Sequence, residues 1–230
     1  MRIAVITARG GSKRIPRKNI RLFCGRPIIA YSIRAAQESG CFDEVMVSTD
    51  DAEIAEVASS LGASVPFIRS LDTSNDHATT AAVLIEVLGK YRERDRVFEE
   101  ACCIYPTAPF VTGASIAKAG ALLRRGDAPG VIPVVRFSYP IQRALRIRDG
   151  AISMLQPEHA LTRSQDLEPA YHDAGQFYWV RVEHFLRTGS LMGPGTLAHE
   201  MPEWEVQDID TESDWKLAEI KFRVLHGLTS

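Results

Sequence analysis

The sequence lacks several features that would assign it quickly to a class of protein. Its four cysteines, Cys24, Cys41, Cys102 and Cys103, form no C-x-x-C pair, and its six histidines show no metal-binding spacing, so a zinc site is not expected. Cys102 and Cys103 lie in an apolar run, which predicts buried thiols in a reducing compartment. No apolar stretch approaches the roughly 18–20 residues of a membrane span. The chain also opens without a signal peptide, so we expect a cytoplasmic protein with no membrane partner.

A large excess of charge of one sign is also missing. The net charge is −2 at pH 7, whereas a general nucleic-acid binder is more often basic overall. A hydrophobic content of 45% and a charged content of 24% are typical of a globular chain with a sizeable core. We therefore expect a single domain over residues 1–230, with a projecting arm at residues 136–168.

Against this ordinary background, one loop near the start of the chain is strongly basic. Residues 3–8 are apolar and partly β-branched, which is typical of a buried strand. The loop after them contains Gly10 and Gly11, whose backbone N–H groups no side chain covers, then Pro16, and five cations: Arg9, Lys13, Arg14, Arg17 and Lys18. Such a charge run is often only a solvated surface. The glycines and the position at the end of a strand instead favour an anion site, and a nucleotide triphosphate above all.

Two well-known phosphate-binding patterns do not describe this loop. The Walker pattern is absent because no Gly-Lys-Ser/Thr follows Gly10 at the required distance. The G-x-G-x-x-G pattern of dinucleotide-binding proteins fails because Ser12 and Ile15 occupy positions that need glycine.

The loop does resemble the opening motif of a known enzyme family. The stretches ARGGSK (residues 8–13) and IPRKN (residues 15–19) are similar to those of the acylneuraminate cytidylyltransferases, the CMP-sialic acid synthetases and their pseudaminic acid relatives. The resemblance implies that the loop binds the triphosphate of CTP and that Asn19 contacts the cytidine. The residues implied at the nucleotide are Arg9, Gly10, Gly11, Ser12, Lys13, Lys18 and Asn19.

The order of strands and helices predicts a Rossmann-like α/β fold with a doubly wound, mostly parallel sheet. We expect strands at residues 3–8, 44–49, 64–68, 101–105 and 130–135. Helices are expected between Pro27 and Gly40, from Asp50 or Asp51 to Gly62, and over residues 112–125 and 211–225. Asp50 and Asp51 can cap a helix, but they could also bind a sugar hydroxyl or a metal ion.

The polar segment 69–80 resembles the part of the family that contacts cytidine. Arg69 and Thr79 are the residues that the resemblance assigns to the nucleotide, and a guanidinium suits phosphate or base oxygens. Asp76 in the same segment has a simpler reading as the cap of the helix that follows.

Residues at two further places are candidates for binding a sugar. The family has glutamine where this chain has Tyr105, which points to a different acidic sugar. The segment YHDAGQFY (residues 171–178) resembles the pseudaminic acid enzymes. Arg163 can pair with a sugar carboxylate, whereas His172, taken alone, could be an ordinary surface or core histidine. The sugar candidates are Tyr105, Arg163, Gln165, Tyr171 and His172.

Asp149-Gly150 is a strong hairpin signal within the expected arm. A lone hairpin cannot bury both of its faces on itself, so we expect it to pack on a neighbouring subunit. In the family such an arm reaches the partner's active site. A homodimer is therefore expected, with a tetramer left open.

Asp208 and Asp210 flank Ile209 near the end of the sequence. In an extended segment both carboxylates would face one side, and two such oxygen ligands suit Mg²⁺. Helix capping is the alternative, but Thr211 and Asp214 already form a capping-box pattern. The family has a similar D-I-D-T segment, which implies that Asp208 and Asp210 bind Mg²⁺.

The resemblance implies a cytidylyltransferase that joins CTP to a nine-carbon acidic sugar, pseudaminic acid in the first instance, and releases pyrophosphate. The residues assigned to catalysis are Arg9, Lys18, Asp208 and Asp210, and the base could be Lys18 or a metal-bound hydroxide. N-acetylneuraminic acid, legionaminic acid and the eight-carbon acid of lipopolysaccharide are alternative acceptors. A non-catalytic nucleotide-sensing module is the alternative outside the enzyme class.

Overall fold

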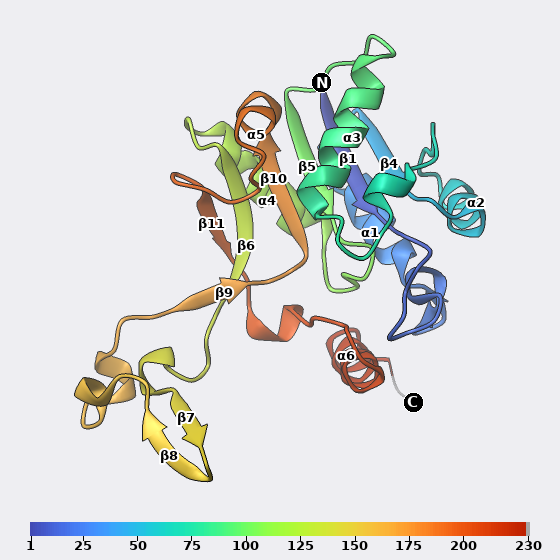
Figure 1. The fold of residues 1–230 in the computed structure, drawn as a ribbon. Coiled ribbons are helices and arrows are strands. Elements are labelled where there is room, and N and C mark those ends of the chain that lie inside the picture. Colours follow the sequence, from blue (N-terminus) through green and yellow to red (C-terminus); the bar gives the residue numbers. More distant parts are fainter. Residues whose placement is uncertain (229–230) are drawn as a thin grey trace.

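A mixed sheet of seven strands forms the centre of the molecule (Figure 1). The structure is a computed structural model that describes residues 1–228. The strand order is β11-β6-β10-β5-β1-β4, and β9 pairs with β6 off this path. The strands are β1 (Arg2–Thr7), β4 (Glu44–Ser48), β5 (Glu100–Ile104), β6 (Gly130–Arg136), β9 (Tyr171–Asp173), β10 (Phe177–Arg181) and β11 (Leu197–Glu200).

Five of the seven strands in this sheet run in the same direction, and only β9 and β10 run the opposite way. β1 pairs in parallel with both β4 and β5, and β6 pairs in parallel with β11. β10 is inserted antiparallel between β5 and β6, and β9 is also antiparallel to β6. The predicted doubly wound, mostly parallel sheet is confirmed, but the two antiparallel strands were not predicted.

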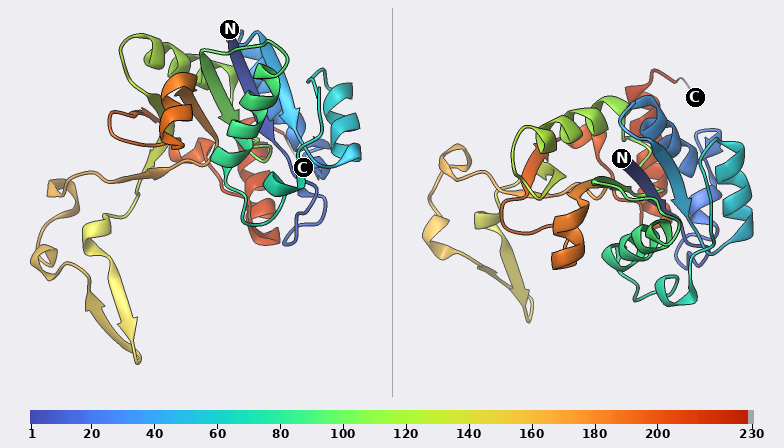
Figure 2. Two further views of the ribbon diagram at one scale, coloured as in Figure 1. Left: turned by 45° about the horizontal axis from the view of Figure 1, so that its top comes forward. Right: turned by 90° about the horizontal axis from the view of Figure 1, so that it is seen from above.

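Helices cover both faces of the sheet (Figure 2). On one face lie α1 (Ile29–Glu38), α2 (Ala52–Ser60) and α4 (Gly113–Arg124), and on the other lie α3 (Thr80–Arg92) and α5 (Val182–Thr188). The alternation along β1 explains this division, because Ala4 and Ile6 face the first group whereas Ile3 and Val5 face the second. No helix in residues 1–228 is long and apolar enough to cross a membrane.

The prediction of a strand at residues 64–68 is wrong. Only Ser64 forms a bridge, to Met46 of β4. Pro66 lacks the N–H group that a continuing ladder would need, and the segment passes on as irregular chain towards η2 (Leu71–Thr73).

A smaller hydrophobic cluster, which we call the aromatic core, joins the start of the chain to α6 (Glu212–Leu225). It contains Ile15 from the basic loop and Ile209 from the Asp208–Asp210 segment. The predicted capping box of Thr211 and Asp214 opens α6. The core residues are Ile15, Phe23, Ile28, Phe110, Ile209, Trp215, Ala218 and Phe222. Two short strands, β2 (Leu22–Phe23) and β3 (Arg26–Pro27), and η1 (Lys18–Ile20) connect this core to α1.

The expected arm projects from the body of the molecule (Figures 1 and 2). Its hairpin consists of β7 (Leu145–Arg148) and β8 (Ala151–Met154). Asp149 and Gly150 have φ values of 49° and 79°, the left-handed conformation that a tight two-residue hairpin turn requires. The short helices η3 (Ile141–Arg143), η4 (Pro157–His159) and η5 (Ser164–Asp166) complete the arm, and η6 (Glu203–Glu205) lies near its base.

Candidate active site

A cavity of about 220 Å³ lies at the carboxyl ends of β1 and β5. This is the edge at which open α/β sheets bind ligands. Many of the residues predicted at the nucleotide meet here, together with the sugar candidate Tyr105. We call it the basic-loop cavity, and its lining residues are Thr7, Arg9, Ser12, Lys13, Arg14, Ile15, Lys18, Asn19, Tyr105, Pro106 and Thr107.

Asp76 binds two of the loop cations at once. Arg9 Nη1 donates to Asp76 Oδ1 at 2.6 Å, and Lys13 Nζ donates to the other carboxylate oxygen. These hydrogen bonds, from Lys13 and from Arg9, lower the pKa of Asp76 to about 2. The simple capping role for Asp76 is wrong, because Thr79 is the N-cap of α3 and accepts a hydrogen bond from the Ala82 N–H at 3.1 Å.

Asp210 contacts the opposite end of the basic loop. Its Oδ1 lies 2.8 Å from Arg14 Nη2 and 3.7 Å from Lys18 Nζ. Lys18 also donates to the Ile209 carbonyl at 2.7 Å. Burial lowers the pKa of Lys18, although the charges of Asp210 and Asp208 act in the opposite direction. Ile209 is buried, as expected, and the carboxylates of Asp208 and Asp210 on either side of it are both close enough to act on the charge of Lys18.

Two adjacent carboxylates, Asp50 and Asp51, hold the glycine turn of the loop. The Gly10 N–H donates to Asp50 Oδ1 at 2.9 Å, so this backbone donor is already bound. Asp51 is the N-cap of α2 and accepts two hydrogen bonds from Arg17, at 2.6 and 3.0 Å. A Cβ atom on residue 10 would lie 2.7 Å from Asp51 Oδ2. This close approach explains why glycine is found there.

The remaining nucleotide candidates have mainly structural contacts. Asn19 is buried at the cavity wall, and its Nδ2 donates to the Arg9 carbonyl at 2.8 Å. Arg69 is buried behind the cavity, where its Nε donates to Ser48 Oγ at 3.0 Å, and burial lowers its pKa. Neither Arg69 nor Thr79 lines the cavity. Thr80 was not predicted as a site residue, but its Oγ1 lies 3.2 Å from the Tyr105 hydroxyl oxygen.

Arg14, Thr7, Pro106 and Thr107 also line the cavity without having been assigned to it. Arg14 was counted among the loop cations, and its charge was the signal that could have placed it. Thr7 lies near the end of the strand predicted at residues 3–8, and the Pro106-Thr107 turn directly follows the strand predicted at residues 101–105. Both strands were expected to end at the same edge of the sheet. The position of these residues was therefore visible in the sequence, although their side chains gave no chemical signal.

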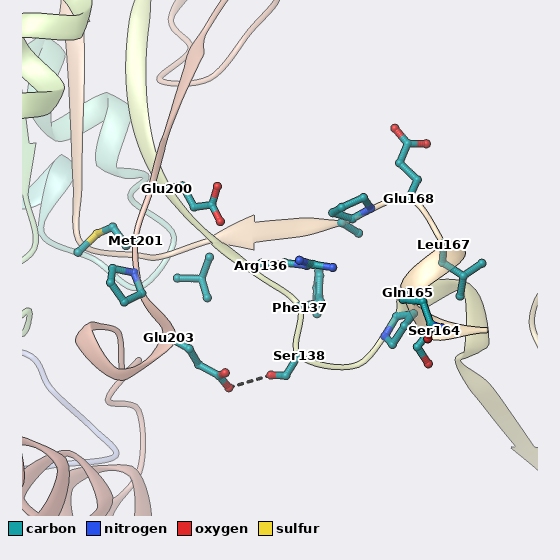
Figure 3. Close-up of a pocket in the computed structure, with 15 residues that line it drawn as sticks. Arg136, Phe137, Ser138, Ser164, Gln165, Leu167, Glu168, Glu200, Met201 and Glu203 are labelled. Carbon is teal, nitrogen blue, oxygen red and sulfur yellow. Dashed lines mark hydrogen bonds between the residues drawn. The ribbon is translucent and has the colours of Figure 1, made fainter. Parts of the chain in front are cut away.

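A second cavity, of about 540 Å³, lies between the base of the arm and the end of β11. Figure 3 shows Glu200, Met201 and Glu203 on its body side and Ser164, Gln165 and Glu168 on its arm side. The Ser138 hydroxyl donates to Glu203 Oε1 at 2.8 Å across its base. Gln165 is the only sugar candidate that lines this cavity within the described chain.

Arg163, Tyr171 and His172 line neither of the two cavities. Arg163 is exposed on the arm and pairs with Asp166 at 2.8 Å. Tyr171 and His172 lie on β9, where the His172 ring is 4.9 Å from the Phe137 ring. Of the predicted sugar set, only Tyr105 lines the basic-loop cavity. Its ring lies 5.5 Å from the Tyr178 ring, and the Tyr178 hydroxyl donates to Asp173, next to His172, at 2.7 Å, whereas Arg163 and Gln165 lie on the arm.

Asp208 and Asp210 have the chemistry expected for Mg²⁺. Among residues 1–228, no group of three or more His, Cys, Asp or Glu side chains forms a complete metal site. Mg²⁺, however, commonly takes one or two carboxylates and completes its shell with substrate phosphates and water. Two carboxylates beside a cationic loop fit that pattern.

Solved structures with the same fold support this description. The chain superposes on CMP:2-keto-3-deoxy-manno-octonic acid synthetase, solved in complex with CTP, with a TM-score of 0.69, 17% identity and 99% coverage of both chains. It also matches 4-diphosphocytidyl-2C-methyl-D-erythritol synthase from Anaerococcus prevotii, with a TM-score of 0.61, 14% identity and coverage of 96% of this chain and 98% of that one. At these identities the likeness establishes the fold.

Sequence relatives establish the family. Pseudaminic acid cytidylyltransferase from Campylobacter jejuni is 39% identical over 97% of both chains. CMP-N,N'-diacetyllegionaminic acid synthase from Legionella pneumophila is 36% identical over 94% of both. N-acylneuraminate cytidylyltransferase A from Danio rerio is 35% identical over 94% of this chain and 49% of its own length. The cytidylyltransferase family model matches residues 3–181. The chain is therefore a nucleotidyltransferase and belongs to the cytidylyltransferase family.

Proposed function

We propose that this enzyme transfers a cytidylyl group from CTP to pseudaminic acid, a nine-carbon acidic sugar, and releases pyrophosphate. The main support is the similarity to the Campylobacter enzyme along nearly the whole of both chains. Tyr105, at the wall of the basic-loop cavity, and the segment 171–178 support this acceptor over sialic acid. The buried free thiols Cys41, Cys102 and Cys103 suit a reducing cytoplasm.

In the proposed reaction, the anomeric C2 hydroxyl of the sugar attacks the α-phosphate of CTP. A bond forms between this oxygen and the α-phosphorus, the hydroxyl proton passes to a general base, and the bond from the α-phosphorus to the oxygen that bridges to the β-phosphate breaks, so that pyrophosphate leaves. Such transfers depend mainly on positioning and on charge neutralisation. Arg9, Lys13 and Lys18 line the cavity and would offset the charge of the triphosphate. Mg²⁺, bound by Asp208 and Asp210, would supply further positive charge at the phosphates.

We propose that the active enzyme is a homodimer in which the arm contacts the second copy. The arm exposes a set of large apolar side chains, more than a solvated hairpin needs. These residues are Tyr139, Ile141, Leu145, Ile147, Ile152, Leu155 and Leu161. Arg163 and Gln165 lie on the same arm, away from the basic loop of their own chain. A neighbouring copy could receive them at its acceptor site, where Arg163 would pair with the sugar carboxylate.

The test is pyrophosphate release with CTP, Mg²⁺ and one acidic sugar at a time. The panel contains pseudaminic, legionaminic and N-acetylneuraminic acids and the eight-carbon acid of lipopolysaccharide. We expect turnover with pseudaminic acid. Turnover with another acid alone would keep the enzyme class and overturn the acceptor. CTP binding without turnover on any sugar would favour a nucleotide-sensing module.

A further inference from the structure

Asp76 forms ion pairs with the loop cations that a triphosphate would need as partners. Arg9 and Lys13 both line the basic-loop cavity, and each binds a different oxygen of this single carboxylate. Asp76 belongs to the segment between η2 and α3 and is 67 residues from Arg9 and 63 from Lys13. A carboxylate and a phosphate present similar paired oxygens to such cations. The Asp76 side chain therefore stands where one phosphate group would bind.

The contact of Asp76 with Arg9 and Lys13 persists over the ordinary pH range, but a charged ligand can displace it. The pKa of about 2 keeps Asp76 ionised at any ordinary pH, so the pairing is not switched off by protonation. The side chains remain partly open to solvent, at 39% for Asp76, 36% for Arg9 and 79% for Lys13. Ion pairs with this exposure are individually weak, so a multiply charged ligand can replace them.

We propose that Asp76 sets the affinity of the nucleotide site by competing with the ligand's phosphates for Arg9 and Lys13. A ligand that needs both cations binds only to those protein molecules in which the ion pairs of Asp76 with Arg9 and Lys13 are broken. Its apparent affinity is therefore reduced by the fraction of such molecules. The same competition weakens the binding of pyrophosphate, the product that leaves. Asp76 pairs with Arg9 and Lys13 again as pyrophosphate dissociates. This role of Asp76 in the enzyme rests on the proposed function, in which CTP is the substrate and pyrophosphate the product.

The competition makes a quantitative prediction. Replacing Asp76 by asparagine keeps the size of the side chain and removes its charge. The dissociation constants of tripolyphosphate, pyrophosphate and CTP should then fall by one common factor, about fivefold for two weak ion pairs. Cytidine, which has no phosphate, should bind unchanged. A general change of electrostatic field would instead affect tripolyphosphate more than pyrophosphate, because the effect would grow with ligand charge.

The experiment is calorimetric titration of wild type, Asp76→Asn and Asp72→Asn with these ligands at constant ionic strength. Asp72 lies in η2, just before that segment, is exposed and forms no ion pair within residues 1–228, so its variant is the charge-matched control. Circular dichroism and an Asp76→Ala variant guard against a folding defect. Weaker polyphosphate binding by both Asp76 variants would show that Asp76 positions the cations and would overturn the proposal, as would equal gains in the Asp72 control.

These titrations do not depend on the acceptor assay. If Asp76→Asn binds tripolyphosphate and pyrophosphate more tightly but no sugar is activated, the competition stands and the proposed function fails. If pseudaminic acid is activated and Asp76→Asn changes no polyphosphate affinity, the proposed function stands and the competition fails. In the active enzyme, the inhibition constant of pyrophosphate should fall by the same factor as its dissociation constant.

Discussion

Gly10 is required by its surroundings rather than by its own backbone angles. It is not among the glycines with positive φ, but a Cβ atom there would meet Asp51 Oδ2 at 2.7 Å. We predict that Gly10→Ala lowers the free energy of unfolding by about 1–3 kcal/mol, the usual cost of an overpacked site. Urea denaturation measures this change. Gly11→Ala is the matched control, because no atom lies within 4 Å of its added Cβ. Equal stability of the two variants would contradict the steric argument.

Asp210 gives a second prediction at the scale of one residue. Asp210→Asn keeps the shape of the side chain and leaves Ile209 in the aromatic core, so the fold should persist. Loss of its charge should lower Mg²⁺-dependent kcat by about 10² or more, as is common when one charge-stabilising group is removed. Steady-state kinetics with varied Mg²⁺ would measure this.

The control for this variant is Asp127→Asn, which removes an exposed charge from the loop between α4 and β6. Its kcat should equal that of the wild type. If Asp210→Asn also retained wild-type turnover and Mg²⁺ dependence, Asp210 would have no place in the site.

Single residues differ in how far the sequence predicts them. The burial of Ile209 and the Thr211–Asp214 capping box were predicted correctly. The capping box is made by near neighbours in the chain, and an apolar residue between two carboxylates indicates by itself which side chain turns to the core. The role of Asp76 could not be read in this way. Its segment holds several side chains able to cap a helix, Thr79 is the one that does so, and the partners of Asp76 lie more than 60 residues away in the sequence.

Whole elements were predicted well where periodicity and caps agree. The helix after Thr112 and the helix after Thr211 begin where their caps indicate. The antiparallel direction of β10 was not predicted. Its residues are apolar on both faces, as in any central strand, and such a run has no local sign of direction. The direction follows only from its position between β5 and β6.

The segment that presents Asp76 is attached to α3 through Glu86. This carboxylate accepts hydrogen bonds from the Ser70 N–H at 2.9 Å and the Ser70 hydroxyl at 2.8 Å, and also from the Thr73 hydroxyl, and it pairs with Lys90. Burial alone would raise the pKa of Glu86, but the bonds from Lys90, Thr73 and Ser70 outweigh it. They lower the pKa from 4.5 to about 2.

A pH dependence follows for Glu86→Gln. Because the folded pKa lies below the unfolded one, ionised Glu86 contributes stability above pH 4.5, and this contribution is lost as the pH falls towards about 2. We expect Glu86→Gln to cost about 1–3 kcal/mol at pH 7, and the difference from wild type should shrink at pH 3. Urea denaturation at both pH values measures this. The exposed Glu93→Gln is the control, and a pH-independent difference would refute the assignment.

For the molecule as a whole, the hairpin turn at Asp149-Gly150 allowed the arm to be located from sequence alone. Its relation to the site could not be found in this way. Tyr105 lies at the basic loop, whereas Arg163 and Gln165 lie on the arm, so the predicted sugar set is divided in space. A local pattern contains no information about which copy of the chain a side chain serves.

Mixed dimers can test the arm directly. Arg163→Ala alone should raise the KM for the sugar with little change for CTP. If Arg163 serves the neighbouring copy, a dimer of one Arg163→Ala chain and one Asp210→Asn chain contains one intact site. Random co-assembly of the two in a symmetric dimer should then restore about a quarter of wild-type activity. The assay uses sugar well below the KM of the Arg163 variant. No restoration would place Arg163 at the site of its own chain.

The aromatic core has a consequence for the timing of biosynthesis. Lys18 in the basic loop bonds to the Ile209 carbonyl, 191 positions later in the chain. At a synthesis rate of about 5–20 residues per second, the loop waits about 10 to 40 s for this partner. During that interval the emerging chain can begin to assemble its sheet, but the loop has neither Ile209 nor Trp215 to pack against. The basic loop therefore reaches its final packing late in translation, and a ribosome that stalls before α6 carries a chain in which this loop lacks its contacts with Ile209 and Trp215.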